Sequence, residues 1–279
     1  MLKNIIKVLF ANIIVMLTSI INTLVIPKIM SIDGYAEYQT FMLFISYVGL
    51  MMFGFHGGLF IKYGGKRQED IDIPQFKSEM SLIIISQSIM SIILCIFSFA
   101  TKNALIFATS LCILTSNFVS CYKYLYQAWD KFTQYSVINV FQSIGFSGVV
   151  VILGIFCKPV DAKKVIITYI LINAICFVIV LREYIRGCKG IKRNPLISIE
   201  NRNILNLGIL LMLSGAANVI FSSVDKYYIK GLFTNYEFSM YCFAITLLNV
   251  MNVFISAIAQ PMYLQLANHI DDYEERSKY

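Results

Sequence analysis

Charged residues are scarce in this chain of 279 residues. Asp, Glu, Lys and Arg make up only 14% of it and hydrophobic residues 58%, whereas a soluble domain carries about 25% charged residues. This balance excludes a water-soluble fold. A bilayer-spanning helix needs about 20 mostly apolar residues, so the chain has room for roughly eight to ten spans and none for a sizeable soluble domain.

Paired cysteines and phosphate-binding loops are also missing. The seven cysteines are scattered without a C-x-x-C pair, and most fall inside apolar runs, which argues against a disulfide framework or a zinc site. The glycines around His56 are followed by no Gly-Lys-Ser/Thr sequence. We therefore expect no metal and no cofactor, and we read the cysteines as small apolar residues.

Uninterrupted apolar runs predict an all-α polytopic transmembrane bundle of about eight spans. Inside lipid, only helices of this length satisfy every backbone polar group. The first run begins after Lys3 and Lys7 but is longer than the apolar core of a signal peptide, so we expect a retained helix. The predicted spans are 4–26, 41–61, 80–100, 105–125, 135–156, 165–181, 204–229 and 238–266.

The lysines and arginines predict the orientation, because short cytoplasmic loops collect positive charge. With the N-terminus inside, sixteen of the 23 cations lie on the cytoplasmic side. We expect an inner (plasma) membrane protein with both termini cytoplasmic. The basic stretch 182–202 is then expected to lie against anionic lipid, and no nucleic-acid partner is predicted.

That basic stretch also marks a boundary between two helical units. The predicted organisation is a six-helix lobe (1–185), a basic cytoplasmic linker (186–202), the first two helices of a second lobe (203–269) and an acidic cytoplasmic tail (270–279). A shift of 203 positions lays Ser31 onto Thr234, Tyr38 onto Tyr241 and Asn22 onto Asp225. Such an ordered match indicates parallel repeats, which is one of the known transporter plans.

Polar residues recur at helical spacing inside several spans. Lipid cannot hydrogen-bond them, so they are expected to face other helices or a hydrated interior. Helix packing without any substrate is the alternative for each stripe, while four stripes in one bundle favour a shared polar interior. The candidate substrate pathway is Asn22, Lys62, Ser116, Ser120, Lys123, Asn139, Gln142, Ser214, Asn218, Ser222, Asp225, Lys226, Asn249, Asn252 and Ser256.

Four of the ionisable side chains have two readings each. Asp225, beside Lys226, either faces the cavity or anchors a helix end at the headgroups. Lys62 and Lys123 are suited to bind a diphosphate, although snorkelling to the interface is favoured. His56 is a candidate for proton coupling, although a packing histidine between Gly54 and Gly58 is favoured, since these glycines form a small-xxx-small surface for close helix approach.

Four segments resemble one family. They are SIDGYAEYQTF at 31–41, FGFHGGLFIKY at 53–63, YQAWDKFTQYS at 126–136, and SSVDKYYIKG at 222–231 followed by YCFA at 241–244. In order and spacing they resemble oligosaccharide flippases of the Wzx type, which are polysaccharide exporters of the multidrug/oligosaccharidyl-lipid/polysaccharide superfamily.

The resemblance implies a carrier that moves undecaprenyl-diphosphate-linked oligosaccharide from the cytoplasmic to the outer leaflet by alternating access, for O-antigen, capsule or exopolysaccharide synthesis. It implies no bond chemistry. The expected partners are the lipid-linked oligosaccharide, membrane lipids, and a polysaccharide polymerase or glycosyltransferases. Two other classes stay open: a multidrug-type exporter of the same superfamily, and an integral membrane glycosyltransferase or polymerase acting on the same lipid carrier.

The family usually has twelve or more helices, and only eight spans are predicted here. We therefore expect a truncated or partial flippase that cannot transport alone. The polar stripes of the seventh and eighth spans are expected to be poorly covered, which favours aggregation or association with another copy.

Overall fold

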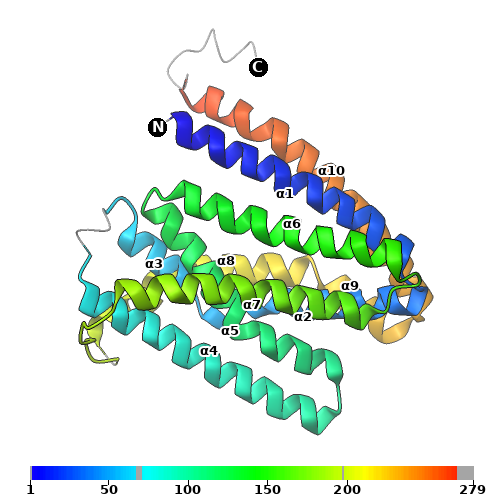
Figure 1. The fold of residues 1–279 in the computed structure, drawn as a ribbon, viewed down its shortest axis with the longest axis horizontal. Coiled ribbons are helices and arrows are strands. Elements are labelled where there is room, and N and C mark those ends of the chain that lie inside the picture. The colour runs from blue at the N-terminus through cyan, green and yellow to red at the C-terminus, as the bar shows by residue number, and fades with distance from the viewer. Residues whose placement is uncertain (1, 67–70, 197, 269–279) are drawn as a thin grey trace.

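The computed structural model describes residues 2–66, 71–196 and 198–268, with side chains over 10–66, 71–196 and 198–251. These residues form a bundle of helices, and no strand occurs among them (Figure 1). The elements in order are α1 (Leu2–Ile29), α2 (Ile32–Val48), the 3₁₀ helix η1 (Gly49–Met52), α3 (Phe55–Tyr63), α4 (Ile73–Thr101), α5 (Ala104–Ala128), α6 (Phe132–Phe156), α7 (Ala162–Gly187), α8 (Ile199–Phe221), α9 (Val224–Leu232) and α10 (Asn235–Asn268).

The fold is that of a multi-pass membrane protein. Within the described residues, six helical segments are long and apolar enough to cross a membrane, and the bent α2–α3 segment makes a seventh. Each of the eight predicted spans falls inside one helix or one broken pair of helices. Large apolar side chains such as Ile96 and Ile155 are exposed on the outside of the bundle, as a lipid-facing surface requires. The predicted all-α polytopic bundle is confirmed.

The sequence suggested one straight helix for the second predicted span, but in the structure this span is broken. After η1 the chain bends by 53° into α3. Gly54 at the bend has a φ of +80°, a conformation that glycine adopts without steric cost. The carbonyls of Val48 and Met51 beside the bend accept hydrogen bonds from the side-chain amides of Asn117 and Gln87, at 3.0 and 2.9 Å. Amides from α5 and α4 therefore hold this break in place.

The seventh predicted span is broken as well. α8 ends at Phe221 and α9 begins at Val224. At the break, the hydroxyl of Ser223 donates to the carbonyl of Val219 at 2.6 Å and lies 2.5 Å from the hydroxyl of Tyr47. Serine hydroxyls that bond to backbone carbonyls in this way compete with the helical ladder and bend helices. Ser222 and Asp225, which the sequence placed on one helical face, lie on either side of Ser223 at this break.

Glycines bring α3 and α8 into backbone contact. A Cβ atom added to Gly208 would lie 1.9 Å from the carbonyl oxygen of Gly54, and one added to Gly58 would lie 2.1 Å from the carbonyl oxygen of Ile204. Only glycine permits such an approach. The small-xxx-small surface predicted at Gly54 and Gly58 is therefore confirmed.

The connections gather at two ends of the bundle, which we call the linker end and the opposite end (Figure 1). The linker end carries the α3–α4, α5–α6 and α7–α8 connections. There the amide of Asn194 donates to the carbonyl of Pro74 at 3.2 Å. The opposite end carries the α1–α2, α4–α5, α6–α7 and α9–α10 connections. The predicted loops thus fall into two groups as the sequence indicated, while the side of the membrane on which each lies stays a prediction.

The predicted repeat fits where α2 and α10 begin. The Ser31 hydroxyl accepts a hydrogen bond from the amide of Gly34 at 3.1 Å, and that of Thr234 accepts one from the amide of Glu237 at 3.3 Å. Each hydroxyl satisfies an amide in the first turn of its helix. The two residues that the repeat pairs therefore have the same capping role, while the lobe boundaries stay a prediction.

Glu79 anchors a buried polar network at the linker end. Its carboxylate is fully buried and accepts hydrogen bonds from Lys62 Nζ at 2.5 Å, Tyr63 Oη at 2.7 Å and Gln75 Nε2 at 2.9 Å. The Gln75 amide also donates to Asn201 Oδ1 at 2.9 Å. The network joins α3, α4 and the start of α8.

Candidate functional site

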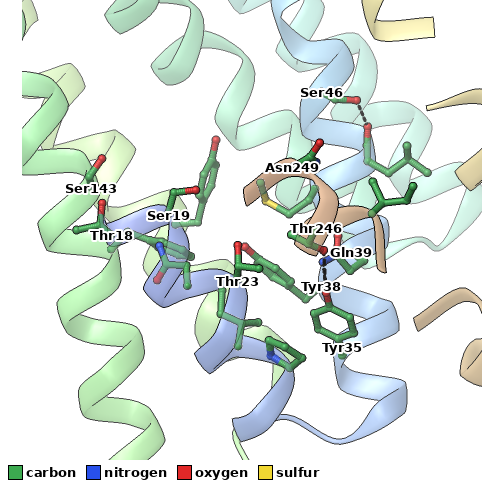
Figure 2. A pocket seen from close by; sticks show the side chains of 18 of the residues that line it. Thr18, Ser19, Thr23, Tyr35, Tyr38, Gln39, Ser46, Ser143, Thr246 and Asn249 are labelled. Carbon is green, nitrogen blue, oxygen red and sulfur yellow. Dashed lines mark hydrogen bonds between the residues drawn. The ribbon is translucent and has the colours of Figure 1, made fainter. Parts of the chain in front are cut away.

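A polar cavity of about 730 Å³ lies inside the bundle. It is bounded by α1, α2, α6, α7, α9 and α10, and Figure 2 shows hydroxyl and amide side chains from α1, α2, α6 and α10 around it. Its volume is within the range of sites for small molecules. The polar lining is Thr18, Ser19, Asn22, Thr23, Tyr35, Tyr38, Gln39, Ser46, Gln142, Ser143, Tyr169, Asn173, Ser222, Ser223, Asp225, Lys226, Thr246 and Asn249.

Most of this lining is polar but uncharged. Among the lining residues only Asp225 and Lys226 carry a formal charge, and they are neighbours at the start of α9. The hydroxyl of Tyr241 donates a hydrogen bond to Asp225 Oδ2. A cavity with opposite charges side by side presents little net charge to a ligand. Its hydroxyl and amide groups can both donate and accept hydrogen bonds.

One wall of the cavity joins α2 to α10. Gln39 Nε2 donates to the hydroxyl of Tyr35 at 2.7 Å, and this hydroxyl lies 3.4 Å from that of Thr246 (Figure 2). On α1, the side-chain oxygen of Asn22 is buried and has no hydrogen-bond partner among the described residues. A buried amide oxygen without a partner is costly.

The wall made by α6 and α7 is backed by a half-buried cation, Lys123. Gln142 Nε2 donates to Asn173 Oδ1 at 3.1 Å, and Ser116 Oγ donates to the same oxygen at 3.4 Å. Behind them, Lys123 Nζ on α5 donates to Gln142 Oε1. Lys123 does not itself line the cavity.

No protein-family model, curated protein or solved structure matches the chain.

The structure brings together several of the residues predicted from the sequence. Six of them line the cavity, and two more, Ser116 and Lys123, touch lining residues from behind. Stripes from four different helices thus converge on one polar interior. The six lining residues are Asn22, Gln142, Ser222, Asp225, Lys226 and Asn249.

Other predicted pathway residues lie elsewhere. Ser214 and Asn218 are exposed on α8, as expected for a poorly covered stripe, and do not reach the cavity. Ser120 and Asn139 are half-buried and do not line it. The side chains of Asn252 and Ser256 lie outside the described residues, as does the predicted acidic tail.

Two lysines differ from their favoured reading as snorkelling side chains. Lys62 points to the buried carboxylate of Glu79, and Lys123 points inward to Gln142. A snorkelling lysine would extend its ammonium toward the headgroups instead. Asp225 is not the sole acid within a span, because α4 begins at Ile73 and includes Glu79.

His56 has a packing environment. Its ring lies 4.8 Å from that of Tyr124 between ring centroids, and its buried Nδ1 has no partner among the described residues. His56 does not line the cavity. This geometry favours the packing role.

The α2 wall was missed by the sequence reading. Tyr35, Gln39, Met42 and Ser46 all line the cavity and are spaced by four, three and four positions. That spacing places them on one helical face, so the same periodicity rule could have found them. Met42 interrupts the polar pattern, and tyrosine is as common in packed cores as in sites.

Proposed function

We propose that this protein moves undecaprenyl-diphosphate-linked oligosaccharide from the cytoplasmic to the outer leaflet of a plasma membrane, for O-antigen, capsule or exopolysaccharide synthesis. The observation that carries the proposal is the lining of the 730 Å³ cavity, in which most residues are uncharged and carry hydroxyl or amide groups. A sugar presents many hydroxyl groups that both donate and accept, and this lining offers matching partners. The likeness of four segments to Wzx-type flippases adds support.

The mechanism needs a polar path for the sugar and an apolar flank for the lipid tail. The cavity supplies the first, and the exposed apolar side chains on the outer faces of the helices supply the second. Exposure of the cavity alternately to the two membrane faces would carry the headgroup across without bond chemistry. The breaks at Gly54 and Ser223 lie where helices would have to swing during such a change.

Two other functions fit the cavity less well. A multidrug-type exporter favours an apolar cavity for lipophilic ions, whereas residues with hydroxyl or amide groups outnumber apolar residues in this lining. A glycosyltransferase or polymerase needs carboxylates free for acid–base work, and Asp225 is the one carboxylate in the described lining. Its carboxylate already accepts a hydrogen bond from the hydroxyl of Tyr241.

The deciding experiment deletes the gene and measures lipid-linked oligosaccharide on the cytoplasmic face of the membrane. We expect this lipid to accumulate and to clear when the gene is restored. A lipophilic-cation efflux assay on the same strains tests the alternative function, that of a multidrug-type exporter. Unchanged lipid-linked oligosaccharide together with lost cation efflux would replace the flippase proposal.

A further inference from the structure

Lys123 is a half-buried cation that has no acidic partner among the described residues. Lys62 pairs with the carboxylate of Glu79, and no other lysine among the described residues has a carboxylate oxygen within 4.0 Å of its ammonium nitrogen. The charge of Lys62 is therefore neutralised, and that of Lys123 is not. The ammonium of Lys123 has three N–H groups, and the hydrogen bond described for it goes to the neutral oxygen Gln142 Oε1. An unpaired charge within a membrane span is costly, and such residues usually serve a function.

The groups around Lys123 form a cluster of donors. Ser116 Oγ and Gln142 Nε2 both donate to Asn173 Oδ1, at 3.4 and 3.1 Å, next to the Lys123–Gln142 hydrogen bond. Three donors from α5 and α6 thus point at two amide oxygens. Amide oxygens carry only partial charge and cannot neutralise the ammonium.

Gln142 separates this cluster from the cavity. Its side chain lines the cavity on one side and touches Lys123 on the other. If the Gln142 side chain turns aside, the oxygen of an anion in the cavity can take the place of Gln142 Oε1. Phosphoryl oxygens are strong acceptors for an ammonium, and lysine binds them as a point charge.

We propose that Lys123 is the phosphoryl-binding group of this cavity, reached by displacement of the Gln142 side chain. Resting on the proposed function, the ligand is the diphosphate of the lipid-linked sugar, and the uncharged hydroxyl and amide groups of the lining face the sugar itself. Lys226, the cation that lines the cavity directly, is paired in sequence with Asp225 and is the poorer site for a dianion.

The experiment measures binding of inorganic pyrophosphate to the purified full chain in neutral detergent by titration calorimetry. Gln142→Glu keeps the side-chain shape and supplies a carboxylate to Lys123, so we expect pyrophosphate affinity to fall at least about tenfold. Lys123→Met should have the same effect and Lys123→Arg should retain binding. Lys102→Gln, which removes an exposed charge at the opposite end, is the matched control and should change affinity less than about twofold.

Three results would overturn the proposal. They are no pyrophosphate binding to the unmodified chain, equal binding to the unmodified chain and to Gln142→Glu, or a loss that follows Lys226→Gln in place of Lys123→Met. The unmodified chain in nanodiscs of phosphatidylglycerol and of phosphatidylcholine tests the source of the phosphoryl group. If phosphatidylglycerol alone abolishes pyrophosphate binding, ordinary anionic lipid is the occupant and the assignment to the diphosphate is wrong.

The outcome is separable from that of the proposed function. Suppose that Gln142→Glu loses pyrophosphate binding but the deletion strain accumulates no lipid-linked oligosaccharide. The anion site would then stand and the flippase function would be wrong. If the lipid-linked oligosaccharide accumulates but Gln142→Glu binds pyrophosphate as the unmodified chain does, the flippase function would stand and the anion site would be wrong.

Discussion

Asp225 is the residue whose chemistry the cavity depends on most directly. Its carboxylate lies at the first turn of α9, where the positive end of the helix dipole favours a negative charge. It accepts hydrogen bonds from Tyr241 Oη and from the amide of Lys226 at 2.8 Å. Because Tyr241 belongs to α10, this carboxylate also joins two elements that meet at the cavity.

Replacement of Asp225 by Asn keeps the side-chain shape and removes the charge. If the charge biases the two arrangements of the carrier, we expect transport to fall at least about tenfold while membrane insertion persists. The measurement is restoration of surface polysaccharide in the deletion strain, with protein levels in the membrane as the reference. Asp33→Asn removes an equal charge from the exposed start of α2 and should transport normally. Normal transport by Asp225→Asn would reduce Asp225 to an anchor of α9.

Sequence reasoning at this scale found polar residues but not their partners. Gln142 was predicted from helical periodicity and Asn22 from its match to Asp225 in the repeat, because a polar group in a membrane helix must face inward. The partner of Lys62 could not be predicted, since Glu79 is seventeen positions away and meets it only through the packing of α3 on α4. Periodicity gives the face of a helix and carries no information about which face opposes it.

At the scale of the elements, the Glu79 network fixes where α8 starts. Asn201 on α8 donates to Ser78 Oγ at 3.2 Å and to the carbonyl of Leu196 at 2.7 Å, and Ser78 Oγ donates to the carbonyl of Pro195 at 2.8 Å. The basic linker is therefore bound to α4 through its backbone as well as through side chains. A carboxylate with three donors is well satisfied, and loss of the carboxylate would leave Lys62 unpaired.

Glu79→Gln should therefore destabilise the chain by about 1 to 2 kcal/mol. The loss stays below that of a fully buried ion pair because Lys62 is 23% exposed and can be partly solvated. The single tryptophan, Trp129, packs against Tyr63 at 6.4 Å between ring centroids, so its fluorescence during unfolding in SDS reports on this region. The double variant Glu79→Gln/Lys62→Gln leaves no unpaired ammonium and should be more stable than Glu79→Gln alone. Equal stability of Glu79→Gln and the unmodified chain would contradict the network's role.

The glycine contact between α3 and α8 gives a second prediction at this scale. Gly208→Ala places a methyl group 1.9 Å from a backbone oxygen that cannot move aside alone, so we expect a loss of about 1 to 3 kcal/mol or a displaced α8. Gly215→Ala on the same helix meets nothing within 4 Å and should be neutral or slightly stabilising. Trp129 fluorescence during unfolding in SDS compares the stabilities of the two variants. Equal stabilities would mean that the α3–α8 contact is not held by this close approach.

The positions of the helices could be predicted from the sequence, while their breaks could not. Apolar runs mark the spans because lipid tolerates only satisfied backbone. The helices exceed the predicted spans at many ends, as α4 does from Ile73, because amphipathic turns continue past the apolar run. The breaks at Gly54 and Ser223 depend on side chains of other helices that satisfy the bent backbone, and these contacts are not local in sequence.

For the whole molecule, the grouping of the loops makes the orientation testable. The test needs exposed positions, and within the linker Asn194 is unsuitable because its side chain donates to Gln75 Oε1 at 3.2 Å. Lys158 at the opposite end and Lys192 in the linker are both exposed. An impermeant thiol reagent on intact cells should label a cysteine at Lys158 and spare one at Lys192.

The native cysteines need a control in this assay. Cys157 is half-buried next to the labelled loop, so the variants are best made in a Cys157→Ser background. Cys188 in the linker region is buried, and burial raises the pKa of its thiol, so it reacts slowly with the reagent. If only the cysteine at Lys192 is labelled, the predicted orientation is wrong and every loop lies on the other side of the membrane.

The contact between Gly54 and Gly208 also has a consequence for synthesis. The two glycines are 154 positions apart, so at about 5 to 20 residues per second the ribosome makes the second roughly 8 to 30 s after the first. Through that interval α3 is already formed, and its glycine surface has no α8 to cover it. Early arrest of translation before Gly208 should therefore leave a nascent chain that is more open to protease than one arrested after α8 has emerged.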